Sequence, residues 1–234
     1  LALALMRAQG RRRTGRSLAI DGHLADAIRS HLPFALTASQ EKAVADIRAD
    51  LTSPHRMVRL LQGDVGSGKA VVALLAMANA AEAGRQAALM APTEILARQH
   101  HARLAPLAAA AGIEVGLLTG RDKGAERAKT IARLASGELN LVVGTHALFQ
   151  EGVTFQDLGF AVIDEQHRFG VHQRFALGAK GEAVDLLVMT ATPIPRSLVL
   201  SYFGDMDVSI LSEKPAGRKP IDTRALPLDR LDEV

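Results

Sequence analysis

Residues 63–70, Gly-Asp-Val-Gly-Ser-Gly-Lys-Ala, have the composition and spacing of a phosphate-binding loop. The segment follows a short apolar run and precedes an alanine-rich stretch, so it would join a strand to the N-terminus of a helix. Backbone N–H groups and the positive end of a helix dipole then converge on one point, which suits a triphosphate. The glycines permit a tight curl, and the lysine can reach the β- and γ-phosphates. We therefore predict a nucleotide site, with an ordinary strand–helix turn as the alternative; its residues are Gly63, Asp64, Val65, Gly66, Ser67, Gly68, Lys69 and Ala70.

Ala70 departs from the usual pattern of such loops, which place Ser or Thr after the lysine. The missing hydroxyl is the group that normally coordinates Mg²⁺. We expect phosphates to bind through Lys69 and the loop backbone, and Mg²⁺ to bind more weakly.

An acidic pair stands directly after an apolar run at 160–163, Phe-Ala-Val-Ile. Such a run is typical of a central parallel strand that is covered on both faces. Ligands of open α/β sheets bind at the carboxyl ends of these strands, where Asp164 and Glu165 would lie. We expect Asp164 to hold Mg²⁺ and Glu165 to polarise the attacking water, unless the pair only caps a following helix. His167 suits a structural or a functional role equally well.

Further turns follow predicted strands and would line the same edge of the sheet. The turn at 92–94, Pro-Thr-Glu, opens a helix, so its N–H groups could bind a nucleic-acid phosphate. Hydroxyls at 190–193, Thr-Ala-Thr-Pro, could hydrogen-bond His167 and report the state of the γ-phosphate. Each turn alone could be purely structural, but their shared placement favours one surface. The candidates for DNA contact or coupling are Pro92, Thr93, Thr119, Gly120, Thr145, His146, Thr190 and Thr192.

The elements that would position these residues alternate as in successive βαβ units, which predicts an α/β fold with a parallel sheet. Strands are predicted at 57–61, 86–90, 115–118, 139–143, 160–163, 186–189 and 208–211. Helices are predicted at 39–49, 69–83, 95–110 and 125–135.

Both ends of the chain differ from this pattern. Residues 1–30 contain no strand-like run and suggest a helical connector, whereas prolines and a glycine after 213 suggest a linker. The chain is therefore expected to consist of a helical connector at 1–30, an α/β domain at 31–212 and a linker at 213–234. A first residue other than Met, together with helical character from the start, suggests a fragment of a longer protein.

Composition excludes several classes of function. With 234 residues, 48% hydrophobic and 23% charged, the chain can fold around a core and is not disordered throughout. It has no Cys, which excludes disulfides, a thiolate zinc site and a cysteine nucleophile. No apolar stretch approaches the ~20 residues of a membrane span, so a cytoplasmic protein is expected. A metal site at His100, His101 and His172 is not expected, because no carboxylate or Cys stands at ligand spacing.

These sites resemble those of superfamily 2 helicases, and more closely those of the RecG family of bacterial replication-fork remodelling helicases. The resemblance covers nearly the whole chain. It rests on Leu-Thr at 36–37 with Gln40, and on the segments 59–69, 90–97, 143–148, 164–171, 189–196 and 204–209.

The resemblance implies a three-layer RecA-like domain with helices on both faces of a mostly parallel sheet, the first of two motor domains. Residues 1–30 would lead from a wedge domain and 213–234 to the second motor domain. ATP and Mg²⁺ would be the cofactors, and branched DNA, contacted through its backbone, the partner of a monomer. Lys69, Asp164, Glu165 and His167 would be catalytic.

Two further roles follow from the resemblance. Gln40 would contact adenine, although Thr37-x-x-Gln40 is also the pattern of a helix capping box. Arg196 would belong to the DNA-contacting or coupling residues.

The leading hypothesis is thus the ATP-binding motor domain of a DNA helicase acting on replication forks and Holliday junctions in recombination and repair. A transcription-repair coupling translocase is the related alternative. A second class, a nucleotide-binding module without turnover, is suggested by Ala70 and by the missing second domain. A kinase is disfavoured because no acceptor site or lid is recognisable. Without the arginine finger of a second domain, this chain alone should hydrolyse ATP barely or not at all.

Overall fold

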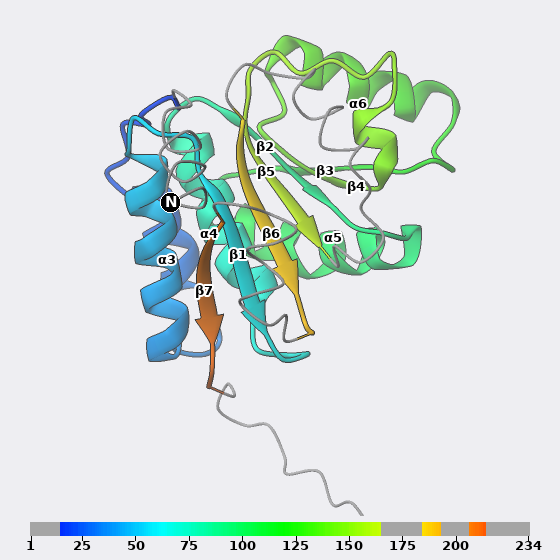
Figure 1. Ribbon diagram of the computed structural model, residues 1–234. Helices are drawn as coiled ribbons and strands as arrows, with labels where there is room; N and C mark the ends of the chain where they lie inside the picture. Colours follow the sequence, from blue (N-terminus) through cyan, green and yellow to red (C-terminus); the bar gives the residue numbers. More distant parts are fainter. Residues whose placement is uncertain (1–14, 165–183, 193–205, 214–234) are drawn as a thin grey trace, which may run out of the picture.

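The computed structural model describes residues 15–164, 184–192 and 206–213. Within them, seven strands form one sheet in which every recorded pairing is parallel, in the order β3-β4-β2-β5-β6-β1-β7 (Figure 1). The strands are β1 Val58–Gly63, β2 Gln86–Met90, β3 Val115–Leu118, β4 Leu141–Gly144, β5 Leu158–Asp164, β6 Asp185–Thr190 and β7 Asp207–Leu211. The helices are α2 His23–Ser30, α3 Ala38–Leu51, α4 Lys69–Glu82, α5 Glu94–Ala109, α6 Gly124–Ser136 and the 3-10 helix η1 His146–Phe149.

The α/β fold predicted from the sequence is confirmed, and each predicted strand and helix is present with ends that differ by at most two residues. Helix α2 and η1 were not predicted separately. Both are short, and short segments give little periodicity to recognise.

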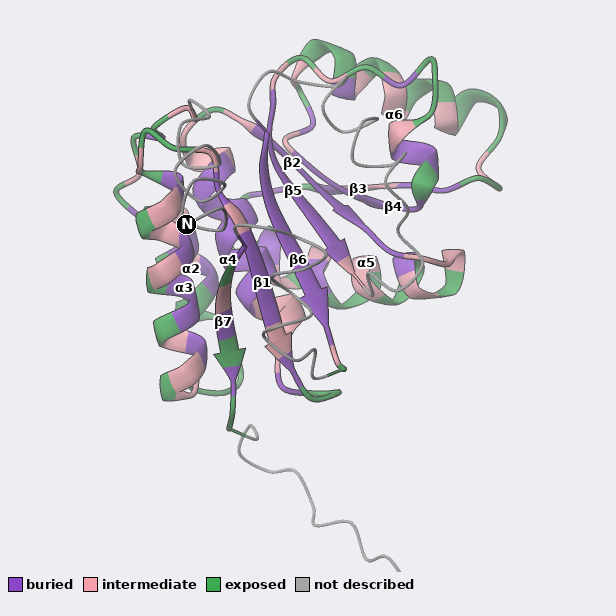
Figure 2. Cartoon of the chain, in the orientation of Figure 1, coloured by how far each residue is buried: buried purple, intermediate pink, exposed green. Residues whose placement is uncertain are grey.

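Helices cover both faces of the sheet, so the fold has the three layers expected. Side chains on one face of the strands pack with α2, α3, α4 and α5, whereas those on the other face pack with α6 and η1. Apart from the edge strands β3 and β7, the strands are buried along most of their length, as Figure 2 shows. Helix α4 is buried from Val72 to Ala80 and forms the centre of its layer. This explains its almost entirely apolar sequence.

Part of the predicted N-terminal connector packs on this core. Residues 15–22 have no regular secondary structure, and the backbone of Leu18 donates a hydrogen bond to the carbonyl of Leu51 (2.9 Å). Leu18, Ala25 and Ile28 are buried in the same core as α3 and α4. Residues 1–14 lie outside the described residues, and the domain boundary at 30 stays a prediction.

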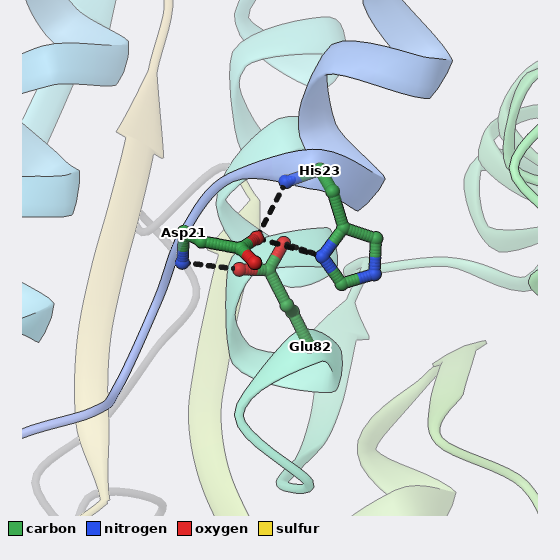
Figure 3. A group of neighbouring side chains, drawn as sticks. All are labelled: Asp21, His23 and Glu82. Atoms are coloured by element: carbon green, nitrogen blue, oxygen red, sulfur yellow. Dashed lines mark hydrogen bonds and ion pairs between the residues drawn. The ribbon is translucent and has the colours of Figure 1, made fainter.

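Glu82, in the last turn of α4, fixes the start of α2 (Figure 3). Its carboxylate accepts the N–H groups of Asp21 (2.6 Å), Gly22 (2.7 Å) and Leu24 (3.1 Å). A carboxylate at a helix N-terminus satisfies donors that have no partner inside the helix. His23 Nδ1 lies 2.7 Å from Asp21 Oδ1 and 3.4 Å from Glu82 Oε2. Because Glu82 already accepts three N–H groups, these side chains are explained as a helix cap.

A buried arginine joins α3 to the strand that leads into the glycine-rich loop. The Nε of Arg59 on β1 lies 2.7 Å from Asp50 Oδ2 on α3, and its Nη1 lies 2.9 Å from Ser209 Oγ on β7. Arg59 is only 8% exposed, so these bonds form in an environment of low dielectric, where they are strong. They fix the helix that begins near Gln40 against β1.

No helix in the described ranges is long and apolar enough to cross a membrane.

Candidate nucleotide-binding site and strand-end loops

The glycine-rich loop has the predicted strand–loop–helix geometry. Strand β1 ends at Gly63, and α4 begins at Lys69 after Gly68, whose φ of 87° is in the left-handed region that favours glycine. A Cβ at Gly68 would lie 2.2 Å from Nε2 of Gln40, and one at Gly63 would lie 2.5 Å from Oγ of Ser67. A side chain at either position would therefore displace Gln40 or Ser67. The positive φ at Gly68 favours glycine there in addition.

Lys69 lies over the loop that precedes it. Its Nζ donates to the carbonyl oxygens of Gly63 (2.7 Å) and Asp64 (3.0 Å). Residues 64–66 are exposed, and the first N–H groups of α4 have no acceptor inside the helix. The ammonium and these N–H groups make a cationic cradle that fits the phosphates of a nucleotide.

Ser67 does not compensate for the hydroxyl that Ala70 lacks. It is 2% exposed, and its Oγ has no hydrogen-bond partner among the described residues. The position of Oγ against Gly63 puts it inside the curl of the loop. It could bind a metal only after the loop rearranged.

Gln40 forms the capping box expected from the sequence. Its Oε1 accepts the N–H of Thr37 (2.8 Å), and Thr37 Oγ1 accepts the N–H of Gln40 (3.3 Å). Its Nε2 also donates to the carbonyl of Ser67 (2.8 Å), a contact that the sequence pattern did not reveal. Gln40 is 1% exposed, so both ends of its amide are engaged in a buried position. Its role towards adenine stays a prediction, and an adenine contact would require a change of partners.

Asp164 ends β5 at the same edge of the sheet as the loop. Strand β6 separates β5 from β1, with Met189 paired to both Asp164 and Leu61. Asp164 is thus level with the end of β1 and about 10 Å from it, which is two interstrand spacings. A triphosphate with its cation can bridge such a gap. The carboxylate offers the hard oxygen donor that Mg²⁺ prefers, so the donor set fits Mg²⁺ held by one carboxylate, phosphates and water.

His100 on α5 contacts this carboxylate, which the sequence did not predict. The distance between His100 Nε2 and Asp164 Oδ2 is 2.7 Å, and the two side chains are 15% and 11% exposed. The residues are 64 positions apart and the contact depends on tertiary packing, so no local pattern could have revealed it. His101 points elsewhere, because its Nε2 lies 2.8 Å from the carbonyl of Val115.

The turns predicted to face DNA follow β2, β3 and β4, which are neighbours in the sheet. Thr93 caps α5 by accepting the N–H of Leu96 (3.3 Å), and Ile95 in the first turn is 71% exposed. Gly120 and His146 are exposed. The carboxyl edge of the sheet therefore has two halves, one at β5, β6 and β1 with the glycine-rich loop, the other at β2, β4 and β3.

Two of the threonines in these turns have buried side chains. The hydroxyl of Thr119 donates to Asp122 (2.8 Å), which also accepts the N–H of Thr119 (2.6 Å). Thr145 caps η1 by accepting the N–H of Ala147. Contacts with DNA at these positions would have to come from the backbone or from their exposed neighbours. The assignment of these residues to DNA stays a prediction.

Acidic and basic side chains alternate on the second half of the edge. The Nη2 of Arg98 lies 3.0 Å from Oε1 of Glu94 and 3.1 Å from Oδ1 of Asp122. The Nε of Arg121 lies 3.3 Å from Oε2 of Glu94. The hydrogen bond from Arg98 to Glu94 raises the pKa of that guanidinium. Burial opposes ionisation of Asp122, but hydrogen bonds from Thr119 and Arg98 outweigh it and lower the pKa of the carboxyl. This network holds α5 against the turn at 119–122.

Thr190 ends β6, which lies between β5 with Asp164 and β1 with the glycine-rich loop. It is fully buried, and its Oγ1 lies 3.0 Å from Oγ1 of Thr192. This proximity joins two of the predicted coupling residues. Glu165, His167 and Arg196, as well as His172, lie outside the described residues, and their roles stay predictions.

A parallel sheet with a phosphate loop at the end of β1 and a carboxylate at the end of β5 is the arrangement of an ATP-dependent motor of the P-loop class. The chain belongs to the DEAD/DEAH box helicase family, whose model matches residues 37–199. It is similar to the ATP-dependent DNA helicase RecG of Streptococcus pneumoniae, at 55% identity over 208 residues, which are 89% of this chain and 31% of that protein. RecG of Thermotoga maritima is 49% identical over the whole of this chain and 30% of its own length.

The fold matches a solved structure of RecG bound to a three-way DNA junction, with a TM-score of 0.85 and 46% identity. The match covers 100% of this chain and 31% of that one. The chain thus spans about a third of the length of these relatives.

Proposed function

We propose that this chain is the ATP-binding motor domain of an ATP-dependent DNA helicase that remodels branched DNA, such as replication forks and Holliday junctions. The observation that carries the proposal is the division of one sheet edge between a phosphate loop with its carboxylate and a row of turns at β2, β3 and β4. Both halves stand on one rigid sheet, so a change at one can move the other. The similarity to RecG proteins along the whole chain supports DNA as the partner.

On the nucleotide half, the loop backbone and Lys69 bind the phosphates, and Asp164 binds Mg²⁺ directly or through water. Mg²⁺, when bound, neutralises charge on the phosphates. Glu165 polarises the attacking water, and His167 couples the γ-phosphate to the turn at 190–192. Gln40 holds the loop through Ser67 and is placed at the start of α3, where an adenine contact would also occur.

On the DNA half, we propose contacts with the backbone of the nucleic acid. N–H groups at the start of α5 bind a phosphate, and Gly120 and His146 extend the surface. Aromatic residues are only 3% of the chain, so base stacking contributes little and sequence preference is weak. Binding should therefore fall steeply with salt.

The whole protein would contain a wedge domain before this chain and a second motor domain after it, would act as a monomer and would reside in the bacterial cytoplasm. The second domain would supply an arginine finger, which in comparable motors accelerates turnover by about 10³ to 10⁵. This chain alone should accordingly bind ATP and hydrolyse little of it.

The test is ATP hydrolysis and fork unwinding by the full-length protein, with and without branched DNA. We expect hydrolysis to require Mg²⁺, to rise with branched DNA and to be lost in Lys69→Ala. Lys42→Ala is the matched control, since Lys42 is exposed on α3 and its one ion pair among the described residues is with Asp46 (3.2 Å). Hydrolysis without unwinding would favour the related transcription-repair translocase. Binding of ATP without hydrolysis would favour a nucleotide-binding module, for which Ala70 is the specific observation.

A further inference from the structure

The pairing of His100 with Asp164 joins α5 to the end of β5 and lies inside the nucleotide half of the edge. The two side chains are largely buried and 2.7 Å apart. An ionised carboxylate can only accept, so the N–H at Nε2 of His100 donates to Oδ2 of Asp164. Oδ1 remains as the oxygen that can face a metal.

Metal binding at this site depends on Asp164 more than in most phosphate-loop proteins. Ala70 provides no oxygen, and Ser67 Oγ is enclosed by the loop. Asp164 offers the carboxylate oxygen that Mg²⁺ prefers, whereas the loop carboxylate Asp64 accepts the N–H of its neighbour Val65 (2.8 Å). A carboxylate that binds a metal benefits from having its orientation fixed by a hydrogen bond.

His100 also connects Asp164 to the other half of the edge. It lies on α5, seven residues after Thr93, the residue that caps this helix. At 1.5 Å per residue, this is about 10 Å along the helix axis. Arg98, in the same stretch, is bonded to Asp122 of the neighbouring turn. One rigid helix thus extends from the predicted phosphate contact of DNA to the carboxylate of the nucleotide site.

We propose that His100 is a positioning residue that holds Asp164 in the orientation that binds Mg²⁺ and makes metal binding respond to DNA at the start of α5. The inference rests on the function proposed above and adds a specific route between the two halves of the edge. DNA that shifts α5 moves His100, and the carboxylate moves with it.

The test compares the ATP affinity of this chain with Mg²⁺ and with EDTA, by calorimetric titration. The ratio of the two affinities measures metal dependence. Loss of an outer hydrogen-bond partner of a metal ligand typically costs 10- to 100-fold in metal affinity, so His100→Ala should reduce the ratio by about that factor. His100→Gln, which keeps a donor near the place of Nε2, should restore most of it. The affinity in EDTA should stay within about twofold in both variants, which also reports that they are folded.

His101→Ala is the matched control, because His101 is adjacent on α5 and its ring hydrogen-bonds with the carbonyl of Val115 instead of Asp164. Its ratio should equal that of the unaltered chain. Single-stranded DNA should change the ratio of the unaltered chain and leave that of His100→Ala unchanged.

The outcomes separate the inference from the proposed function. An unaltered ratio in His100→Ala, or an equal loss in His101→Ala, would overturn the role of His100 while the nucleotide site stands. A DNA effect that is absent in the unaltered chain, or that persists in His100→Ala, would overturn the coupling. If the unaltered chain bound no ATP at all, the proposed function would fail, and the inference with it.

Discussion

Gln40 and Ser67 are joined by a hydrogen bond of 2.8 Å from the side-chain amide to the backbone carbonyl, so the start of α3 is fixed to the phosphate loop. The same amide accepts the N–H of Thr37 and completes the cap of α3. The sequence predicts that Gln40 caps a helix or contacts adenine; in the structure it also supports the phosphate loop.

This relationship predicts that Gln40→Ala weakens ATP and GTP binding by similar factors, because the lost bond acts through the loop and not through the base. The loss should be about threefold to thirtyfold, from one or two hydrogen bonds of about 1 kcal/mol each. Titration of both nucleotides against the unaltered chain and Lys42→Ala checks it. A loss confined to ATP would instead indicate a direct adenine contact.

Ala70→Thr should strengthen nucleotide binding in the presence of Mg²⁺ and leave binding in EDTA nearly unchanged. The added hydroxyl replaces a water on the metal, a change on the order of 1.5–3 kcal/mol, or roughly tenfold to a hundredfold. Val71→Thr adds a hydroxyl one residue further along α4 and serves as the control. Equal metal dependence in Ala70→Thr and the unaltered chain would mean that Asp164 and water already complete the site.

Asp185 should make the chain less stable as the pH rises towards neutral. Burial raises the pKa of Asp185 from 3.8 to about 7, against the opposing effect of the Met57 N–H that it accepts. The folded state therefore holds a proton that the unfolded state releases above about pH 4. Stability from this group is complete below that pH and is lost as the pH rises through 7, by up to about 4 kcal/mol.

Asp185→Asn, which stays neutral and can still accept the N–H of Met57, tests this directly. Urea denaturation should find the variant more stable than the unaltered chain at pH 8 and similar to it at pH 4. The idea fails if the difference between the two is the same at both pH values.

Asn79 lies in the buried centre of α4, and neither atom of its side-chain amide has a hydrogen-bond partner within the described part of the chain. A buried polar group without a partner costs about 1–3 kcal/mol. Asn79→Leu, which has the same branched outline with methyl groups in place of the polar atoms, should therefore raise the free energy of unfolding by about 1 kcal/mol or more in urea denaturation. A decrease of that size would show that the amide is satisfied in solution.

Most of the fold could be predicted because each strand is a short apolar run. Each helix between strands is long enough to be recognised by its helix-forming residues. The phosphate loop was likewise predictable, since Gly63, Gly68 and Lys69 are local in sequence and their geometry is dictated by the backbone. The capping box of Thr37 and Gln40 spans four residues and was found for the same reason.

What could not be predicted depends on contacts between distant segments. The bond between His100 and Asp164, the amide of Gln40 on Ser67 and the packing of residues 15–30 on α4 all require the sheet order, which local patterns do not give. The buried hydroxyl of Thr119 is a similar case. Its position after a strand predicted a hydroxyl that could contact DNA. In the structure this hydroxyl donates to Asp122, three residues later.

The central claim is that the two halves of the sheet edge bind different ligands. Its most direct test is to measure ATP affinity by calorimetry and single-stranded DNA affinity by fluorescence anisotropy for two variants of this chain. Lys69→Ala should lose ATP affinity by roughly tenfold to a hundredfold and keep its DNA affinity, because it removes a charge-assisted contact at the phosphate loop. Ile95→Glu puts a negative charge on the exposed first turn of α5 and should lose DNA affinity while it keeps ATP affinity. Loss of both ligands in either variant, or of neither, would contradict the account.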